Sequence, residues 1–272
     1  MGRVVGTHGL ADAGRTEVAP RVLAAWDAFL ASAESADLER GCSTAGSTGA
    51  DVCIRLGLWT EYAALHDLVS SARSGAVGPP PDLDAVVETH RSAGRDEILA
   101  ALRRHRDAVS IYFNSFDEWL DLDPTVSPFG RLPLLTTLLG QVYPLAVHAL
   151  DLVDCGAPPP PDFLLDSGLA AFVDLLGGLA CEDGITGGAA VFTPPSGGWA
   201  FACGEEGWTV TTLDRRRPGG TVIEGPAAEV LAASAGRSEL RALRVHQQAG
   251  LLRLTDVVRR LGRTTAMPKP QA

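Results

Sequence analysis

Residues 139–156 read LGQVYPLAVHALDLVDCG, and their apolar side chains recur at the spacing of an α-helix. At about 100° of rotation per residue, Gln141 and His148 fall almost on one line, and Asp151 lies one turn further on the same side. Leucines surround this polar strip, at positions Leu134, Leu138, Leu145 and Leu152. The polar strip is therefore expected to face the inside of a helical bundle.

Pro144 stands four residues before His148 in this helix, which is expected to begin near Arg131 or Pro133 and to end before CGAPPPPD. A proline inside a helix cannot donate the backbone hydrogen bond to the residue four places earlier. It therefore frees the carbonyl of Gly140 and tends to kink the helix axis. We expect a bend close to the polar strip.

Helical periodicity continues on both sides of this stretch. Residues 18–36 predict a first long helix, and the glycine- and serine-rich segment 41–51 predicts a loop after it. Further helices are expected at 58–74, at 82–119 with a break in the sequence SAGRDE, and at 163–179. Four or five helices with short connections are typical of a bundle.

The composition changes near Asp183. The runs GGAAVFTPP, GGWAFACGEEGWTVTTLDR and GGTVIEGP are short, rich in β-forming residues and bounded by glycine and proline, as successive antiparallel strands are. AAEVLAASAGR predicts a helix that ends at Gly236, and LLRLTDVVRRLG predicts another. The sequence thus predicts an α+β protein, with a helical bundle at 1–185 and a small α+β domain with an antiparallel sheet at 186–272.

Charge and composition limit the partners of the chain. Thirty-three acidic against twenty-three basic residues give a net charge of -10, which argues against a nucleic-acid surface and against attraction to anionic lipid. A small-molecule ligand is the remaining expectation, and an anionic one would need a local basic group. The composition does not indicate an oligomeric state.

The expected location is the cytoplasm. The five cysteines are odd in number and form no CxxC pair, which is typical of reduced thiols. The first fifteen residues have no apolar core of a signal peptide, and the apolar stretch 132–153 is interrupted by polar residues, as in a buried helix.

Burying an imidazole and a carboxylate costs free energy unless they are paired or bind something. His148 could therefore be a core histidine satisfied by Asp151, or it could belong to a site where facing helices supply converging side chains. The segment LWTEYAALHDL could supply the second group. There, periodicity favours His66 as the inward residue, since Asp67 points roughly away from the apolar stripe.

Three segments resemble actinobacterial proteins related to mycothiol-dependent maleylpyruvate isomerase. LWTEYAALHDL, which contains Trp59, is similar to the family's Gly-Trp-Thr helix, AVHALDL to its His-x-x-Asp-Leu helix, and IEGPAAEVLAASAGR to its Gly-Arg segment. The resemblance implies a DinB-like bundle of four or five helices, followed by a domain similar to sterol-carrier folds. It covers most of the chain.

The resemblance also implies a metal site with altered ligands. The family binds a divalent metal, usually zinc, through three positions that read Asp67, Pro144 and His148 here. Proline offers no side-chain donor, and catalytic zinc normally has three protein ligands. We therefore expect no metal, and no mycothiol either, because in that family the metal activates the thiol. Zinc and mycothiol stay possible if Asp67, or His66 after a shift of one residue, replaces a ligand.

The candidate roles follow from these residues. His148 is the expected general acid or base, assisted by His66 or Asp67, and Asp151 orients its ring. In the family, the arginine that matches Arg237 belongs to the active-site cleft, where it would pair with a substrate carboxylate. Arg237 could equally be a residue that stabilises the end of its helix. The other expected substrate-binding residues are Gln141 and Trp59.

Three functions fit this pattern. The first is an isomerase-like or transferase-like enzyme that works without metal on a small, carboxylated or polyfunctional metabolite, possible in specialised metabolism. The second is a zinc- and mycothiol-dependent transferase or isomerase with substituted ligands. The third is a non-catalytic protein that binds a small molecule. In each case we expect the pocket at the junction of the two domains.

Overall fold

The computed structural model describes most of the 272-residue chain. The described residues are 7–42, 47–59, 69–70, 82–115, 117–127, 129–214, 221–238, 243–246, 254, 256–259, 261–262 and 265. The expected helix at 58–74, with His66 and Asp67, lies mostly outside them. The expected helix LLRLTDVVRRLG is described only in part, and its described residues from 254 to 262 are helical.

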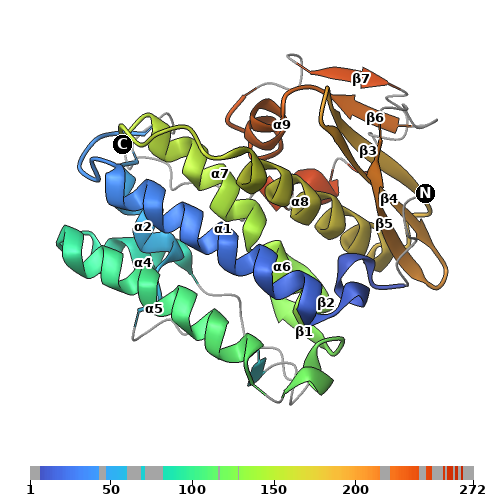
Figure 1. The fold of residues 1–272 in the computed structure, drawn as a ribbon, viewed down its shortest axis with the longest axis horizontal. Helices are drawn as coiled ribbons and strands as arrows, with labels where there is room; N and C mark the ends of the chain where they lie inside the picture. The colour runs from blue at the N-terminus through green and yellow to red at the C-terminus, as the bar shows by residue number, and fades with distance from the viewer. Residues whose placement is uncertain are drawn as a thin grey trace.

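The described residues before 114 are mainly helical, as predicted. After a short turn of 3-10 helix, α1 runs across the molecule between α5 on one side and α7 on the other (Figure 1). The predicted break in SAGRDE is confirmed, because α4 ends before it and α5 begins at Arg95, but α5 stops at Phe113 and not at 119. The bounds are η1 Gly9–Ala13, α1 Arg15–Ser35, α2 Gly49–Leu56, α4 Leu83–His90 and α5 Arg95–Phe113.

Helix α2 begins at Gly49, inside the loop that the sequence predicts at 41–51. The prediction is therefore wrong for residues 49–51, which are helical. The helix starts with a capping box: the Thr48 side chain accepts from the Asp51 backbone N–H, and the Asp51 carboxylate accepts from the Thr48 N–H at 2.8 Å. This reciprocal pairing satisfies two backbone donors at the helix start. The helix then places Arg55 in its last turn.

The stretch with His148 forms two helices, with a break at Gln141 just before Pro144. Helix α6 ends at Gly140, and α7 begins at Val142, so Pro144 lies in the first turn of α7, where a missing N–H is tolerated. An interruption of the helix beside Pro144 is thus present, at Gln141, while the expected bend of the axis stays a prediction. Of the two expected starts, the one near Pro133 is confirmed, because α6 begins at Leu134 with Pro133 as its N-cap. The start near Arg131 is wrong, since that residue belongs to β2. The bounds are η2 Glu118–Leu120, β1 Pro124–Ser127, β2 Gly130–Pro133, α6 Leu134–Gly140, α7 Val142–Val153 and α8 Asp162–Glu182.

Helix α8 lies between α7 and the sheet (Figure 1). A Cβ atom at Gly168 would lie 2.4 Å from that of Ala146 on α7, and one at Gly177 would lie 2.6 Å from the ring of Trp208 on the sheet. Glycine is therefore required for close packing on both sides. The helix is long and apolar enough to cross a membrane, but 83% of its most apolar window is buried in the fold, as in a core helix.

The second half contains a five-stranded sheet in the order β5-β4-β3-β6-β7. Neighbouring strands are antiparallel except β3 and β6, which are parallel. The α+β class is thus confirmed, whereas the parallel pair and β7 were not predicted. The bounds are β3 Gly187–Thr193, β4 Gly197–Gly204, β5 Gly207–Leu213, β6 Thr221–Glu224, α9 Ala227–Ser234 and β7 Arg244–His246.

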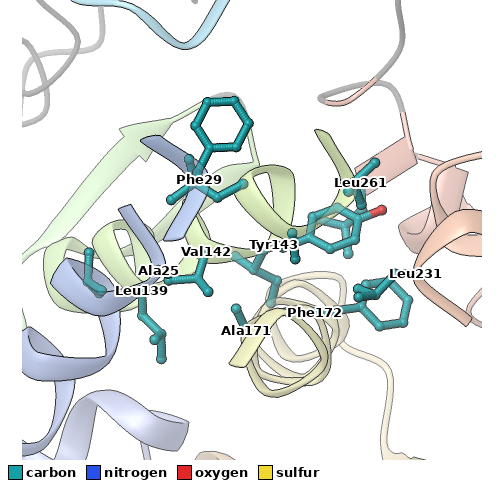
Figure 2. Close-up of a cluster of buried hydrophobic side chains, with 14 of the residues drawn as sticks. Ala25, Phe29, Leu139, Val142, Tyr143, Ala171, Phe172, Leu231 and Leu261 are labelled. Carbon is teal, nitrogen blue, oxygen red and sulfur yellow. The ribbon is translucent and has the colours of Figure 1, made fainter. Parts of the chain in front are cut away.

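A continuous hydrophobic core joins the helices to the sheet and to α9. Figure 2 shows its part around Tyr143, which lies between Phe29 of α1, Phe172 of α8 and Leu231 of α9. The Tyr143 hydroxyl also lies 3.1 Å from that of Ser234. The boundary expected near residue 185 falls between the end of α8 at Glu182 and the start of β3 at Gly187, and the division into two domains stays a prediction.

Candidate functional site

His148 and Asp151 form a buried pair on α7. They are three residues apart, so their side chains lie on one face of the helix. Nδ1 of His148 is 2.9 Å from Oδ2 of Asp151, and the residues are 0% and 2% exposed. The leucine-lined polar strip of the sequence is therefore an inward-facing hydrogen-bonded pair.

Arg237 completes this cluster from the other half of the chain. Helix α9 ends at Ser234, and Gly236 follows with a φ of 73°, in the left-handed region. The Arg237 N–H then donates to the carbonyl of Ala232 at 2.8 Å. The guanidinium then meets Asp151 through Nε to Oδ1 at 3.2 Å and Nη2 to Oδ2 at 2.9 Å. This fork geometry holds the carboxylate in a fixed orientation.

Most remaining donors of Arg237 are also paired. Nη1 donates to the carbonyl of Ala235 at 2.9 Å, and Nη2 donates to that of Thr265 at 2.7 Å. The structure therefore places Arg237 as the partner that orients Asp151. The expected contact of Arg237 with a substrate carboxylate stays a prediction.

The electrostatics of the cluster favour an ionised aspartate beside a neutral histidine. Burial alone would raise the pKa of Asp151, but hydrogen bonds from His148 and Arg237 lower it to about 2. Burial lowers the pKa of His148, and this effect exceeds the opposing hydrogen bond to Asp151. Near neutral pH the imidazole is therefore uncharged.

The hydrogen bond to an ionised carboxylate also sets the tautomer of His148. Asp151 can only accept, so the ring proton lies on Nδ1, and Nε2 carries the lone pair. Nε2 is buried and has no hydrogen-bond partner among the described residues. A buried acceptor without a partner lowers the stability of a fold. A general base, however, requires such a free lone pair to accept a proton.

Arg55 of α2 is a second cation that acts on His148, and it was not among the site residues predicted from the sequence. Its charge contributes to the lowered pKa of His148, as does that of Arg237. The Arg55 side chain is 4% exposed and pairs with Asp84, while its Nε is buried without a described partner. The available signal was an arginine inside the apolar run VCIRL of residues 52–56.

The other predicted residues are placed differently. Gln141 precedes α7, and its side-chain oxygen is buried without a described partner. Trp59 is 4% exposed, donates from Nε1 to the carbonyl of Ile54 at 2.8 Å and stacks on His90 with ring centroids 3.8 Å apart. His66 and Asp67 lie outside the described residues, so their assistance to His148 stays a prediction, as does ligand binding by Gln141 and Trp59.

The described donors around His148 do not suit a zinc ion. Zinc sites combine three or four nitrogen, sulfur or carboxylate ligands. Here Pro144 provides none, Asp151 is held by Arg237, and the two nearby cations would repel a metal ion. Among the described residues no group of three potential ligands is close enough to hold a metal. The expectation that the site works without metal stays a prediction.

The fold is similar to that of a known enzyme. One structure, the mycothiol-dependent maleylpyruvate isomerase, superimposes with a TM-score of 0.56 at 16% identity, covering 85% of this chain and 92% of the isomerase. A single-residue variant of that isomerase gives a TM-score of 0.54 at 16% identity, covering 87% and 95%. No family model matches the chain, and no curated protein sequence matches it. The comparisons thus establish a fold similar to that of mycothiol-dependent maleylpyruvate isomerase.

Proposed function

We propose that the protein is a small-molecule enzyme in which His148 transfers protons without the help of a metal ion. One observation carries the proposal: Nδ1 of His148 is tied to the ionised Asp151, while Nε2 is buried and has no described partner. The similar fold of an isomerase supports an enzyme over a purely structural protein. The reaction class is isomerisation, cyclisation or group transfer.

The pair supplies a general base that is ready at neutral pH. The lowered pKa of His148 keeps Nε2 unprotonated, so it can remove a proton from a substrate held within hydrogen-bond reach. The resulting imidazolium would be stabilised by the carboxylate of Asp151, which stays ionised. Returning the proton to a different atom of the substrate would complete an isomerisation.

The charges favour an anionic substrate. The chain has a net charge of -10, yet the positive charges of Arg55 and Arg237 both act on the neutral imidazole of His148 and lower its pKa. Nε of Arg55 is buried and has no described partner. A small carboxylated metabolite would satisfy both the charge and this donor.

Access to Nε2 requires a change in structure. His148 is 0% exposed, so neighbouring side chains must move before a ligand reaches the ring. We expect substrate binding to protect the protein against heat, because a ligand that binds only the folded state stabilises it. A thermal shift is thus a way to find the ligand before any reaction is known.

The experiment is a comparison of metabolite conversion by two proteins. The wild-type protein and the His148→Gln variant are each incubated with a small-molecule extract, and the extract is followed by mass spectrometry. Glutamine keeps a polar side chain but cannot exchange a proton near neutral pH. We expect at least one carboxylated compound to be converted by the wild-type protein alone, in the presence of a chelator.

Other outcomes select the other functions. Conversion that requires added zinc and mycothiol would favour a reaction like that of the isomerase with the similar fold. A compound that raises the thermal midpoint but is not converted would favour a binding protein. Conversion by the folded His148→Gln variant at the wild-type rate would overturn the assignment of His148.

A further inference from the structure

Two cysteine thiols lie in contact outside the proposed site. Sγ of Cys42, which lies between α1 and α2, is 3.2 Å from Sγ of Cys155, two residues beyond the end of α7. Cys155 is fully buried, whereas Cys42 is partly exposed. The residues are 113 apart in sequence, so the contact is a product of the tertiary fold.

A backbone hydrogen bond and a contact of the Cys155 thiol hold the two segments together. The N–H of Asp37 donates to the carbonyl of Cys155 at 2.7 Å, and the Cys155 thiol lies 3.4 Å from the carbonyl of Arg40. The N–H of Cys42 donates to the carbonyl of Ser47 at 2.9 Å, which fixes the position of Cys42. The proximity of the two sulfurs is therefore built into the backbone.

The surroundings leave room for a bond between the sulfurs. A Cβ atom at Gly49 would lie 3.2 Å from Sγ of Cys155, so glycine at this position keeps the space beside that sulfur open. The S–S bond of a disulfide is about 2.0 Å long. The present separation of 3.2 Å can therefore close through a small rotation of the partly exposed Cys42 side chain.

From the 3.2 Å contact between the two sulfurs, we propose that Cys42 and Cys155 form a reversible disulfide when the protein meets an oxidised low-molecular-weight disulfide. The Cys42 thiolate attacks one sulfur of that disulfide, whose S–S bond breaks and releases one small thiol. The Cys155 thiolate then attacks Sγ of Cys42 and releases the second small thiol. Two protein thiols are thus oxidised, and one small disulfide is reduced to two thiols, which take up both protons.

The order of attack follows from exposure. Cys42 is the thiol that an external oxidant can reach, and the buried Cys155 can react only with a sulfur already beside it. Burial raises the pKa of the Cys42 thiol, so the exchange should accelerate as the pH rises. The product would tie the segment after α1 to the end of α7, four residues beyond Asp151.

The bond would stabilise the fold whether or not the proposed function is correct. A crosslink between residues 113 apart restricts the unfolded chain strongly, and long loops gain most in the chain-entropy description. We expect the oxidised protein to melt several degrees above the reduced protein. Cys53 is buried and interacts with Cys155, so the test must show which of Cys42 and Cys53 bonds to Cys155.

The test uses the full-length protein and glutathione disulfide at about pH 8.5, where thiolates are more abundant. After exchange, free thiols are blocked, the protein is digested, and linked peptides are identified by mass spectrometry. We expect a Cys42–Cys155 peptide in most molecules and an intact mass lower by two hydrogens. A Cys53–Cys155 link, glutathione retained on Cys42, or free thiols throughout would overturn the proposal.

Two serine variants make the comparison specific. Cys42→Ser should abolish both the linked peptide and the oxidation-dependent rise in thermal midpoint. Cys181→Ser removes another partly exposed thiol, which donates to the carbonyl of Gly204 at 3.9 Å, and should retain both. If oxidation still raises the thermal midpoint of the Cys42→Ser variant, the proposed bond is not the cause of that rise. The peptide map of the wild-type protein decides the question even if a variant fails to fold.

Discussion

The guanidinium of Arg237 and the carboxylate of Asp151 face each other through two hydrogen bonds, of 3.2 and 2.9 Å. The residues are 86 positions apart, and they join the segment after α9 to the helix that carries His148. Because the carboxylate is buried, the same contact affects both the stability of the fold and the protonation of the imidazole.

Arg237→Met should destabilise the protein by about 3–5 kcal/mol, because it leaves the buried carboxylate of Asp151 without its cation. Chemical denaturation at neutral pH measures the change. The matched control is Arg244→Met, since Arg244 lies 3.8 Å from Glu224 with its side chain 78% exposed, and this change should cost less than about 1 kcal/mol. Equal effects of the two changes would contradict the role of Arg237.

Asp174→Asn should stabilise the protein above neutral pH. Oδ1 of Asp174 on α8 accepts from Nε1 of Trp208 at 2.9 Å and from the N–H of Leu10 at 3.0 Å, and an asparagine oxygen can accept both. Burial raises the pKa of Asp174 from its ordinary 3.8 to about 7. The fold therefore favours the protonated carboxyl of Asp174. The stability that this provides is complete below pH 3.8 and is lost as the pH rises through 7.

The size of this effect is about 4 kcal/mol between pH 4 and pH 7, the free energy of about three pH units. The difference in unfolding free energy between Asp174→Asn and the wild-type protein, measured across that range, isolates the group from all others. Asp166→Asn is the matched control, because Asp166 is an exposed carboxylate on the same helix that also accepts from a tryptophan, Nε1 of Trp199 at 2.9 Å. A difference that is flat with pH for Asp174→Asn would refute the prediction.

The sequence predicts the long helices and the irregularity before His148 because these depend on local periodicity and on one proline. Helices α1 and α8 each bury an apolar face, and the break at Gln141 lies next to Pro144, which has no N–H to donate to the carbonyl of Gly140. The eight-residue α2 was missed because its turn-forming residues look like a loop. Its capping box, from Thr48 to Asp51, was the signal that could have identified it.

Long-range placement explains the remaining errors. β3 and β6 are parallel neighbours in the sheet although β4 and β5 lie between them in the sequence, and no local pattern specifies that pairing. The contact between His148 and Asp151 was accessible from helical spacing alone. The arrival of Arg237 at Asp151 and the burial of Arg55 near His148 depend on packing between distant segments.

Gly168→Ala should destabilise the protein by about 1–3 kcal/mol, since the added Cβ would lie 2.4 Å from that of Ala146 and would force α7 and α8 apart. Thermal and chemical unfolding measure the loss. Gly204→Ala adds the same methyl group where no atom lies within 4 Å and should change the stability by less than about 0.5 kcal/mol. If Gly168→Ala is as stable as the wild-type protein, the helix contact is looser than described.

Purified protein should contain far less than one zinc ion per chain, and a chelator should leave its thermal midpoint unchanged. The reason is the donor set around His148, where Pro144 offers no ligand and two cations lie nearby. Elemental analysis and melting curves test this. The double variant Pro144→Glu with Asp67→His introduces a glutamate and a histidine at the two positions where the sequence departs from the family that it resembles. We expect this variant to gain affinity for zinc. Near-stoichiometric zinc in the wild-type protein would contradict the prediction.

The most direct test of the account is the rate at which the His148→Gln variant converts the compound that the wild-type protein consumes, with the thermal midpoint measured on the same samples. A general base contributes about 10²–10⁴ to the rate, so we predict at least a hundredfold loss in a variant that is still folded. If His148 only pairs with Asp151 in the core, the variant should lose about 1–3 kcal/mol of stability. A destabilised His148→Gln variant with the wild-type rate per folded molecule would contradict the central claim.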